Sequence, residues 1–407
     1  MASARRQSDP GRSRHDPAAP GAAPGAAPAV ADPLDGEGGF GVYVHVPFCA
    51  RRCDYCAFAT FTDRDHLMDD YTAACTAEIA AADQLPPASS VFVGGGTPSR
   101  LDPGALADVV ASVPRRPQAE VTVECNPEDA SAARFRRWAA AGVTRVSFGV
   151  QSMVPHVLRG LGRHHDPAMV APALGWAADA GIASTNVDLI FGGAGEHDED
   201  WADTLRQVLN LRPRPQHISA YALTVEPGTP LQRDPSRHPD DDVQAGRYEL
   251  ADAVLHDAGF AWYEVSNWAQ PGHRCRHNQL YWDQGDYRGI GCAAHSHRAG
   301  RRWWNIRTPE RYIAAVAAGR DPTAGAEVLT DAQRDFERLV LELRTARGVP
   351  NDALPELPEL DGLVTRSGGR VVLTVRGRLL ANAVTALLRP PGRSAEEHQG
   401  AAGILPA

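Results

Sequence analysis

Short apolar runs and amphipathic stretches alternate along the chain between about residues 42 and 223. Strands are predicted at 42–46, 90–93, 120–123, 145–149, 185–190 and 217–223, and helices at 65–82, from Pro103, at 130–141, 167–180 and 200–211. About six strand–helix units of this kind predict a parallel sheet with right-handed crossovers. The predicted fold class is therefore α/β, with a partial (β/α)6 barrel of the TIM type.

The pattern changes after about Pro239. A helix at 240–258 and a strand at 262–265 precede a region rich in aromatic residues and histidine, 267–304. Further helices at 309–318, 331–344 and 376–388, with one hairpin arm at 368–373, predict a small α+β C-terminal domain. The expected divisions are a disordered Ala-, Pro- and Gly-rich leader at 1–39, the barrel at 40–265, the C-terminal domain at 266–390 and a flexible tail at 391–407.

Charge and composition narrow the function classes. The chain has 41 basic and 50 acidic residues, a net charge of −9, which argues against a protein built mainly to bind nucleic acid. No apolar run approaches the roughly 20 residues that span a bilayer, so no transmembrane segment is expected. The leader lacks the apolar core of a secretory signal. We therefore expect a cytoplasmic location, where the reducing environment keeps thiols free.

Three of the seven cysteines lie in one loop directly after the first predicted strand. Cys49, Cys53 and Cys56 have the spacing C-x3-C-x2-C, which suits a shared inorganic centre better than disulfide pairing. Thiolates select iron–sulfur clusters, zinc or Cu(I), and spacing alone leaves open a zinc site completed by a distant His or Cys. Aromatic neighbours favour a redox cluster, because apolar shielding controls solvent access: Tyr43, Phe48, Tyr55 and Phe58. A 4Fe–4S cluster normally takes four cysteines, so three leave one iron open.

Glycines and polar residues follow several predicted strands at their carboxyl ends, where parallel sheets place ligand chemistry. The run 94–98, G-G-G-T-P, lets a ligand approach the backbone closely, although a glycine run also suits a tight turn. Glu124, Gln151 and Asp188 can accept hydrogen bonds from amine and hydroxyl groups. Arg163 can pair with a carboxylate through two parallel bonds. Taken singly, each also suits a cap or a surface position, but their shared edge predicts one binding site.

From about Gly41 to Trp304, the chain resembles the radical S-adenosylmethionine enzymes. The resemblance rests on the C-x3-C-x2-C loop, with Tyr55 before its last cysteine, and on G-G-G-T-P. It implies a 4Fe–4S cluster on the three loop cysteines, with the open iron chelated by the amino and carboxylate groups of S-adenosylmethionine. It also implies contacts to S-adenosylmethionine from residues at matching positions: Tyr43, Tyr55, Gly95, Gly96, Thr97, Glu124, Gln151, Arg163, Asp188 and Ala222.

Four motifs resemble the anaerobic coproporphyrinogen III oxidase group within that superfamily: Y-V-H-V-P-F-C, G-G-G-T-P-S, F-G-V-Q-S and L-G-R-x-H. Those oxidases decarboxylate two propionates of a porphyrinogen, a step of porphyrin biosynthesis. Their loop carries an additional cysteine two places after the third, where this chain has Phe58 after Ala57. We also expect no structured N-terminal extension like theirs. Oxidase activity is therefore the alternative function rather than the preferred one.

The chain is more similar to a sister branch of heme chaperones, which carries the motif H-N-x-x-Y-W. The motif is present as His277, Asn278, Tyr281 and Trp282. Imidazole is a common ligand of heme iron, and Tyr and Trp offer flat surfaces to a macrocycle, so His277, Tyr281 and Trp282 are candidate heme contacts. The same residues also suit backbone capping and the filling of a domain junction. His295 and Cys275 are competing iron ligands.

The function implied by this resemblance is binding of heme and its transfer to acceptor proteins, with a 4Fe–4S cluster and S-adenosylmethionine as cofactors. A membrane respiratory enzyme is one class of acceptor, and a homodimer is one possible assembly. Whether the chain is an enzyme stays open, because contacts to S-adenosylmethionine do not establish its cleavage. A zinc-stabilised α/β binding protein is a third alternative.

Overall fold

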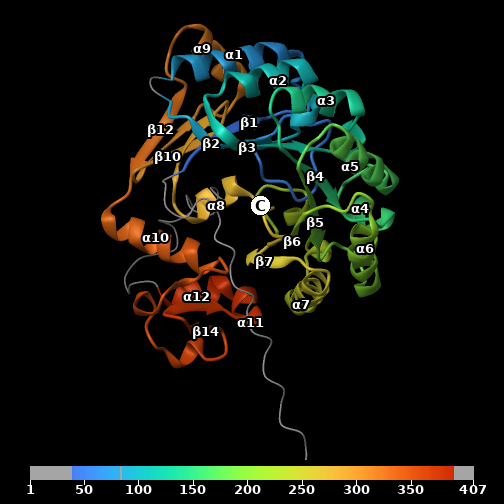
Figure 1. The fold of residues 1–407 in the computed structure, drawn as a ribbon, viewed down its shortest axis with the longest axis vertical. Coiled ribbons are helices and arrows are strands. Elements are labelled where there is room, and N and C mark those ends of the chain that lie inside the picture. Colours follow the sequence, from blue (N-terminus) through green and yellow to red (C-terminus); the bar gives the residue numbers. More distant parts are fainter. Residues whose placement is uncertain (1–38, 83–84, 389–407) are drawn as a thin grey trace, which may run out of the picture.

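The structure is a computed structural model that describes residues 39–82 and 85–388. Six parallel strands lie side by side in sequence order at its centre (Figure 1). They are β1 (Phe40–Val46), β2 (Ala88–Gly95), β3 (Arg115–Cys125), β4 (Arg145–Gln151), β5 (Ser184–Phe191) and β6 (His217–Ala222). The six strands predicted for the barrel are thus confirmed, and so is the α/β fold class.

Side chains alternate between the two faces of these strands, as a period of two residues requires. On β1, Val42, Val44 and Val46 are buried in the main hydrophobic core. Tyr43 and His45 instead face a cavity inside the barrel. The outer face of the sheet is therefore apolar, and the inner face is free to carry polar and aromatic groups.

Helices cover the outer face, and Figure 1 shows them following the sheet from α1 to α6. They are α1 (Met68–Ala81), α2 (Pro103–Ser112), α3 (Ala132–Ala140), α4 (Pro155–Gly160), α5 (Val170–Asp179) and α6 (Asp198–Asn210). Asp102 caps α2 by accepting hydrogen bonds from the N–H groups of Gly104 at 2.8 Å and Ala105 at 3.0 Å. Helix α4 was not predicted from the sequence, because its six residues are too few to show a helical period.

The same sheet continues on both sides of the six parallel strands. The additional strands are β7 (Ala261–Glu264), β8 (Asn267–Ala269), β9 (Asp286–Ile290), β10 (His295–Arg298), β11 (Arg301–Asn305) and β12 (Thr323–Val328). Strand β9 lies parallel to β1, β10 to β12 follow it in antiparallel order, and β8 and β7 extend the opposite edge beyond β6. The described residues therefore form an open barrel sheet of twelve strands.

Four further helices complete the barrel region and lead away from it. They are α7 (Asp241–Asp257), α8 (Arg276–Trp282), α9 (Pro309–Ala317) and α10 (Asp331–Leu343). Helix α8 packs against β1 and β2 near their amino ends, where the ring of His277 reaches Ser90. It lies near the middle of the molecule in Figure 1, and its Asn278 and Tyr281 line a cavity inside the barrel.

The described part of the chain ends in a small lobe with its own sheet, which is visible at the lower left of Figure 1. Its elements are β13 (Val349–Pro350), β14 (Val364–Ser367), β15 (Arg370–Leu373), α11 (Val375–Leu379) and α12 (Ala381–Leu387). The hairpin predicted around 368–373 is confirmed as β14 and β15. The single closing helix predicted at 376–388 is wrong, because the backbone at Leu380 leaves the helical region with φ −103° and ψ 20°.

The lobe has a separate hydrophobic core that begins at Leu343 and includes Val371 and Val384. The division predicted at 265/266 stays a prediction, and β8 to β12 beyond that point belong to the barrel sheet. The predicted leader at 1–39 lies outside the described residues except for Gly39, and so does the predicted tail at 391–407.

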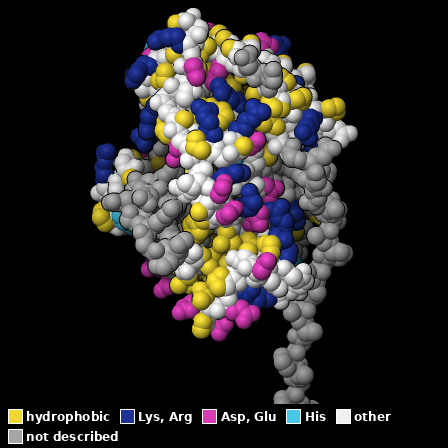
Figure 2. Space-filling view, turned by 90° about the vertical axis from the view of Figure 1, so that its left-hand side faces the viewer, with side chains coloured by type: hydrophobic (Ala, Val, Ile, Leu, Met, Phe, Trp, Pro, Cys, Tyr) yellow, Lys and Arg dark blue, Asp and Glu magenta, His cyan; other side chains and the backbone are white. Residues whose placement is uncertain are grey.

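Basic and acidic side chains are interspersed on the face of the molecule shown in Figure 2. A protein that follows a nucleic-acid backbone uses a basic patch or stripe. That nucleic acid is not a ligand stays a prediction. Among the described helices, none is long and apolar enough to cross a bilayer.

Candidate cofactor and ligand site

The cysteine loop is fixed where β1 ends. The N–H of Cys49 donates to the carbonyl of Phe61 at 3.0 Å, and the N–H of Phe61 donates to the carbonyl of Pro47 at 2.7 Å. Nε2 of His45, on β1, lies 3.0 Å from the carbonyl oxygen of Ala59 in the loop. The first predicted strand therefore delivers the three cysteines at the carboxyl edge of the sheet, as the sequence predicts.

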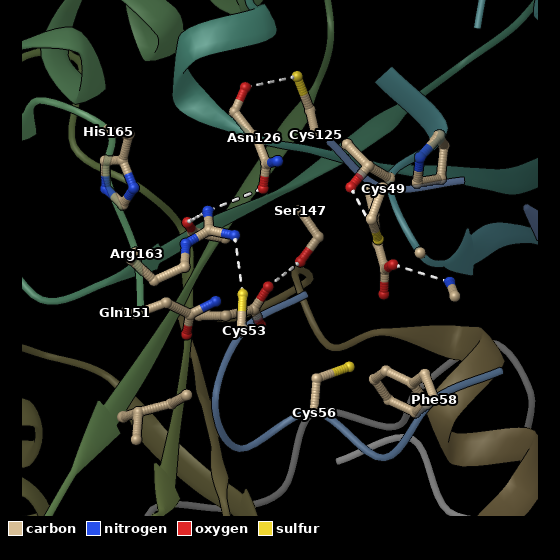
Figure 3. A pocket seen from close by; sticks show the side chains of 18 of the residues that line it. Cys49, Cys53, Cys56, Phe58, Cys125, Asn126, Ser147, Gln151, Arg163 and His165 are labelled. Carbon is tan, nitrogen blue, oxygen red and sulfur yellow. Dashed lines mark hydrogen bonds between the residues drawn. The ribbon is translucent and has the colours of Figure 1, made fainter. Parts of the chain in front are cut away.

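The loop faces a cavity of about 620 Å³, which we call the cluster cavity. It is lined by most of the predicted site residues: Cys49, Cys53, Tyr55, Cys56, Gly95, Gly96, Thr97, Glu124, Gln151, Arg163 and Asp188. The close view in Figure 3 shows the three cysteines on one loop, with the sulfur of Cys53 directed at Arg163. The expectation that one edge of the sheet gathers these side chains is met.

The donor set at the loop can be compared with what each metal centre requires. Cys49, Cys53 and Cys56 are free thiols of intermediate exposure. Within residues 39–82 and 85–388, no group of three or more His, Cys, Asp or Glu side chains could hold a single metal ion. Three thiolates on one loop match the ligand set of a 4Fe–4S cluster with one open iron, whereas a tetrahedral zinc site would need a fourth ligand.

Burial favours the protonated thiol of two loop cysteines, Cys49 and Cys56, as long as no metal centre is bound. Burial raises the pKa of the Cys49 thiol, and it raises the pKa of the Cys56 thiol to about 11. Arg163 donates from Nη1 to Sγ of Cys53 at 3.8 Å and places a positive charge beside that sulfur. Because the thiolate is the form that binds metal, a bound cluster displaces the protons that burial otherwise retains.

The glycine run at the end of β2 lets the cysteine loop lie directly against it. The N–H of Gly96 donates to the carbonyl of Val46 at 2.7 Å, and the N–H of Thr97 donates to the carbonyl of Phe48 at 2.8 Å. A Cβ placed on Gly96 would lie 2.8 Å from both carbonyl oxygens and 3.1 Å from Sγ of Cys49. Only glycine fits this close approach.

Two carboxyl groups face the cavity from β3 and β5. Oε2 of Glu124 accepts a hydrogen bond from the N–H of Gly95 at 3.1 Å. Asp188 accepts from Oγ of Ser147 at 2.9 Å and from Nδ2 of Asn186 at 2.8 Å. Burial and the neighbouring Asp188 raise the pKa of Glu124 to about 8, and burial also raises the pKa of Asp188. A cationic amine that enters beside Glu124 would favour its ionised form.

Arg163 and Gln151 are held by the structure around them. Nη2 of Arg163 donates to Oδ1 of Asn126 at 2.8 Å and to the carbonyl of Gly149 at 2.9 Å, whereas its Nε has no partner among the described residues. Gln151 ends β4 with a φ of 63°, an uncommon conformation for a residue other than glycine. Both side chains line the cluster cavity, but Nη2 of Arg163 is already engaged in hydrogen bonds within the protein.

A second cavity of about 510 Å³ lies beside the first. We call it the aromatic cavity, because six aromatic side chains line it: Tyr43, Phe58, Phe92, Tyr281, Tyr287 and Trp304. Tyr43, predicted to contact S-adenosylmethionine, lies here rather than in the cluster cavity. Ala222 lines neither cavity. Both cavities share one wall, formed by Phe58, Phe92, Gly95, Glu124 and Asn278.

The predicted heme residues separate in the structure. His277 is completely buried, with Nδ1 3.0 Å from Oγ of Ser90 and Nε2 2.9 Å from the hydroxyl of Tyr281. Burial lowers the pKa of His277 to about 3. Tyr281 and Asn278 line the aromatic cavity, but His277 and Trp282 line neither cavity. Neither ring nitrogen of His277 is free to bind iron in this conformation.

The competing ligands also differ in access. Cys275 lines the cluster cavity but is buried, and its Sγ lies 3.6 Å from Oε1 of Glu120. His295 is exposed and lines the aromatic cavity. Of the three ligands proposed from the sequence, only His295 presents its imidazole to a cavity without a hydrogen-bonding partner among the described residues.

Several polar residues of the inner face are additions to the predicted site. Asn186 on β5 and His217 on β6 both line the cluster cavity, and Nδ1 of His217 lies 2.6 Å from Oδ1 of Asn186. His165 lines the cavity as well, is 7% exposed, and has no hydrogen-bonding partner for either ring nitrogen within the described residues. Polar residues at alternate positions of otherwise apolar strands, such as Asn186 and Asp188, are the sequence signal that could have identified this inner face.

Comparisons with known proteins place the chain in a family. Residues 43–208 match the radical SAM superfamily. The heme chaperone HemW of Mycobacterium tuberculosis is 43% identical to this chain over 377 residues, which cover 88% of this chain and 96% of that protein. The chain belongs to the HemW family. The HemW of Escherichia coli is 38% identical over 305 residues, which cover 73% of this chain and 78% of that protein.

The fold of this chain also matches that of a solved structure. Coproporphyrinogen III oxidase (HemN) from Escherichia coli, a radical SAM enzyme, matches with a TM-score of 0.75 over 86% of this chain and 90% of that one. Its sequence identity is 23%, so the likeness shows a shared fold alone. The resemblance predicted from the motifs is confirmed, and so is the partial barrel.

Proposed function

We propose that this chain binds heme and transfers it to acceptor proteins. The observation that carries the proposal is the 43% identity to a heme chaperone HemW across 96% of that protein's length. The aromatic cavity supports it, because a flat apolar macrocycle suits a pocket lined by aromatic rings. Its volume of about 510 Å³ lies within the roughly 300–1,000 Å³ typical of ligand pockets.

The cluster cavity would hold the two cofactors that the radical SAM superfamily implies. Cys49, Cys53 and Cys56 would bind a 4Fe–4S cluster, and S-adenosylmethionine would lie against Gly95, Glu124 and neighbouring residues of the same cavity. When bound and reduced, the cluster would supply one electron for cleavage of a carbon–sulfur bond of S-adenosylmethionine. The residues themselves position the ligand: Glu124 accepts hydrogen bonds, and Arg163 places positive charge beside Cys53.

Phe58 separates this proposal from a porphyrinogen oxidase. It occupies the place at which the oxidases carry an additional cysteine, it is 42% exposed, and it lines both cavities. An apolar ring at this wall can pack against a macrocycle but cannot bind metal or transfer a proton as a thiol can. Oxidase activity is therefore an outcome of the test rather than a second proposal.

The partners and the compartment belong to the same proposal. A membrane respiratory enzyme is the class of acceptor we propose, and assembly as a homodimer would present two heme sites. A reducing cytoplasm suits seven cysteines that include buried free thiols such as Cys75 and Cys292.

The test is an anaerobic heme-transfer assay on the full chain with its cluster reconstituted. Heme is added to micromolar protein, a Soret band is recorded, and the complex is mixed with a heme-free b-type cytochrome. We expect a Soret shift on binding and transfer to the cytochrome faster than from free heme. A parallel incubation with coproporphyrinogen III, S-adenosylmethionine and a reductant is expected to yield no protoporphyrinogen. Absence of heme binding, or formation of protoporphyrinogen, would overturn the proposal.

A further inference from the structure

The cluster cavity extends well beyond the edge of the sheet that carries the cysteine loop. Gln151 lies at the carboxyl end of β4, whereas Arg145 is the first residue of the same strand, and both line the cavity. A strand rises about 3.3 Å per residue, so roughly 20 Å of backbone separates the two positions. The inner end of the cluster cavity, as we call it, is lined by Thr122, Arg145 and His217.

Arg145 is a buried cation without an acidic partner. The residue is 2% exposed, and its Nη1 donates to Oγ of Ser184 at 2.9 Å and to the carbonyl of His273 at 3.0 Å. Both acceptors are uncharged. Its Nε and Nη2 make no hydrogen bond, and the guanidinium forms no ion pair, with any residue of 39–82 or 85–388. A buried charge is costly unless a counter-charge accompanies it, so an anionic ligand at the inner end would stabilise this group.

The neighbouring ionisable groups do not supply that counter-charge. Oε1 of Glu120 accepts from the N–H of Arg276 at 2.9 Å, at the start of α8. Both carboxylate oxygens of Asp188 already accept hydrogen bonds from side chains of the inner face. Burial and the charge of Arg145 lower the pKa of His217, so its ring is neutral. The positive charge of Arg145 therefore stays available to a ligand in the cavity.

A second group at the inner end also has no partner. Thr122 on β3 lies opposite Arg145 on β4 in the register of the two parallel strands, so both side chains point to the inner face. Thr122 is completely buried, and its Oγ1 has no hydrogen-bonding partner among the described residues. Buried hydroxyl groups usually have one. The hydroxyl and the guanidinium thus offer adjacent donors to the same space.

A single carboxylate matches these donors better than a phosphate group does. Nε and Nη2 lie on one edge of a guanidinium and can donate two parallel hydrogen bonds to a planar carboxylate. One negative charge also balances the one positive charge of Arg145, whereas a phosphate monoester carries about −1.5 to −2 charges at pH 7. The surplus would face Glu124 and Asp188, whose raised pKa values show that this interior disfavours negative charge.

We propose that the inner end of the cluster cavity binds the carboxylate of a small organic acid through Nε and Nη2 of Arg145 and the hydroxyl of Thr122. The acid is a further ligand, distinct from S-adenosylmethionine, whose own carboxylate is expected at the open iron beside the three thiols. The inference goes beyond the proposed function, because it concerns neither heme nor its transfer, and the two are tested separately.

The test is equilibrium dialysis of radiolabelled acetate against the full chain, with its cluster reconstituted and S-adenosylmethionine at saturation. The bound S-adenosylmethionine covers the open iron and Arg163, which are other positions at which acetate can bind. We expect one acetate per chain to bind saturably at constant ionic strength. Unlabelled phosphate and chloride are expected to displace it only weakly.

Two variants and two matched controls assign the bound acetate to the site. Arg145→Gln should weaken acetate binding about tenfold or more, because it removes the charge. Thr122→Val removes only a hydroxyl without a partner, so stability in urea should be retained while acetate binds about fivefold more weakly. Arg115→Gln and Thr185→Val should match the wild type, because Arg115 on β3 and Thr185 on β5 line neither cavity.

Four results would overturn the inference. The wild type binds no acetate saturably, or it binds phosphate more tightly than acetate. Acetate binds only when S-adenosylmethionine is absent, which would make Arg145 a partner of that cofactor. Folded Arg145→Gln and Thr122→Val both bind acetate as the wild type does. If Arg145→Gln does not fold, the affinity of Thr122→Val decides alone.

Discussion

The two cavities of this protein lie side by side but are built in different ways. The cluster cavity is lined at the carboxyl ends of β1 to β6 by thiols, carboxyl groups and guanidinium groups, most of which already hold a hydrogen bond. The aromatic cavity is lined mainly by rings, and its His295 and Arg307 make no polar contact with the described residues. The first is a site of hydrogen-bonded ionisable groups that suit ionic cofactors, whereas the second offers apolar surface and two free polar groups to a cargo that must leave again.

Loss of a loop thiol is expected to have the largest effect, and it should act on the cluster cavity alone. Cys53→Ser removes one of three ligands, so iron and acid-labile sulfide after reconstitution should fall close to zero. Colorimetric iron and sulfide analysis measures this. Cys75→Ala is the control, because Cys75 is a buried thiol of α1 that lines neither cavity. A full cluster in Cys53→Ser would show that the loop does not bind it.

The next prediction concerns the wall of the aromatic cavity. His277→Ala leaves Ser90 and the hydroxyl of Tyr281 without a partner and opens a hole between α8 and β2, so it should destabilise the fold by about 3 kcal/mol. Urea unfolding of the cluster-free protein checks this. Unchanged stability together with complete loss of heme binding would instead make His277 the iron ligand.

The protonation of His277 gives a third prediction. Its pKa is about 3 in the fold and about 6.5 in the unfolded chain, so the unfolded chain binds more protons below pH 6.5. The stability contributed by the neutral ring is therefore full above pH 6.5 and is lost as pH falls, by about 2 kcal/mol at pH 5. His277→Gln should flatten this acid slope in urea titrations of the cluster-free protein. An identical slope in both proteins would contradict the buried position of the ring.

The smallest predicted effect belongs to the shared wall. Glu124, whose pKa is about 8, must lose a proton to face a cationic amine, so the affinity for S-adenosylmethionine should rise up to tenfold per pH unit until about pH 8 and then level off. Glu124→Gln should weaken binding about tenfold at pH 8 and remove most of the pH dependence. Isothermal titration of the cluster-loaded protein between pH 6.5 and 8.5 measures both. A flat wild-type profile would mean that the carboxyl group is already ionised.

The cluster cavity was largely predictable from the sequence, and the aromatic cavity was not. The C-x3-C-x2-C spacing and the polar residues at strand ends are local signals, and parallel strands bring such ends together without further information. By contrast, β9 to β12 join the sheet through pairings across distant parts of the chain, such as Tyr43 opposite Gly289, which no local pattern shows. The aromatic cavity therefore depends on contacts that periodicity does not report.

His277 and His295 show the same limit of prediction from sequence. The motif H-N-x-x-Y-W directs attention to His277, yet a motif reports which residue is present and not whether its nitrogens are free. Both ring nitrogens of His277 have hydrogen-bonding partners in the interior. The ring nitrogens of His295, which lies outside that motif, have none among the described residues, because the residue faces the aromatic cavity. Similarly, alternation along β1 turns Tyr43 toward the aromatic cavity, a direction set by the pairing of β1 with β9.

The wall common to both cavities has a thermodynamic consequence. Phe58, Phe92, Gly95, Glu124 and Asn278 face both interiors, so any displacement of these residues by one occupant changes the space offered to the other. Such an effect must be reciprocal: whatever factor the first occupant applies to the affinity of the second, the second applies to the first. Release of a cargo from one side can therefore be set by the state of the other, with no moving domain between them.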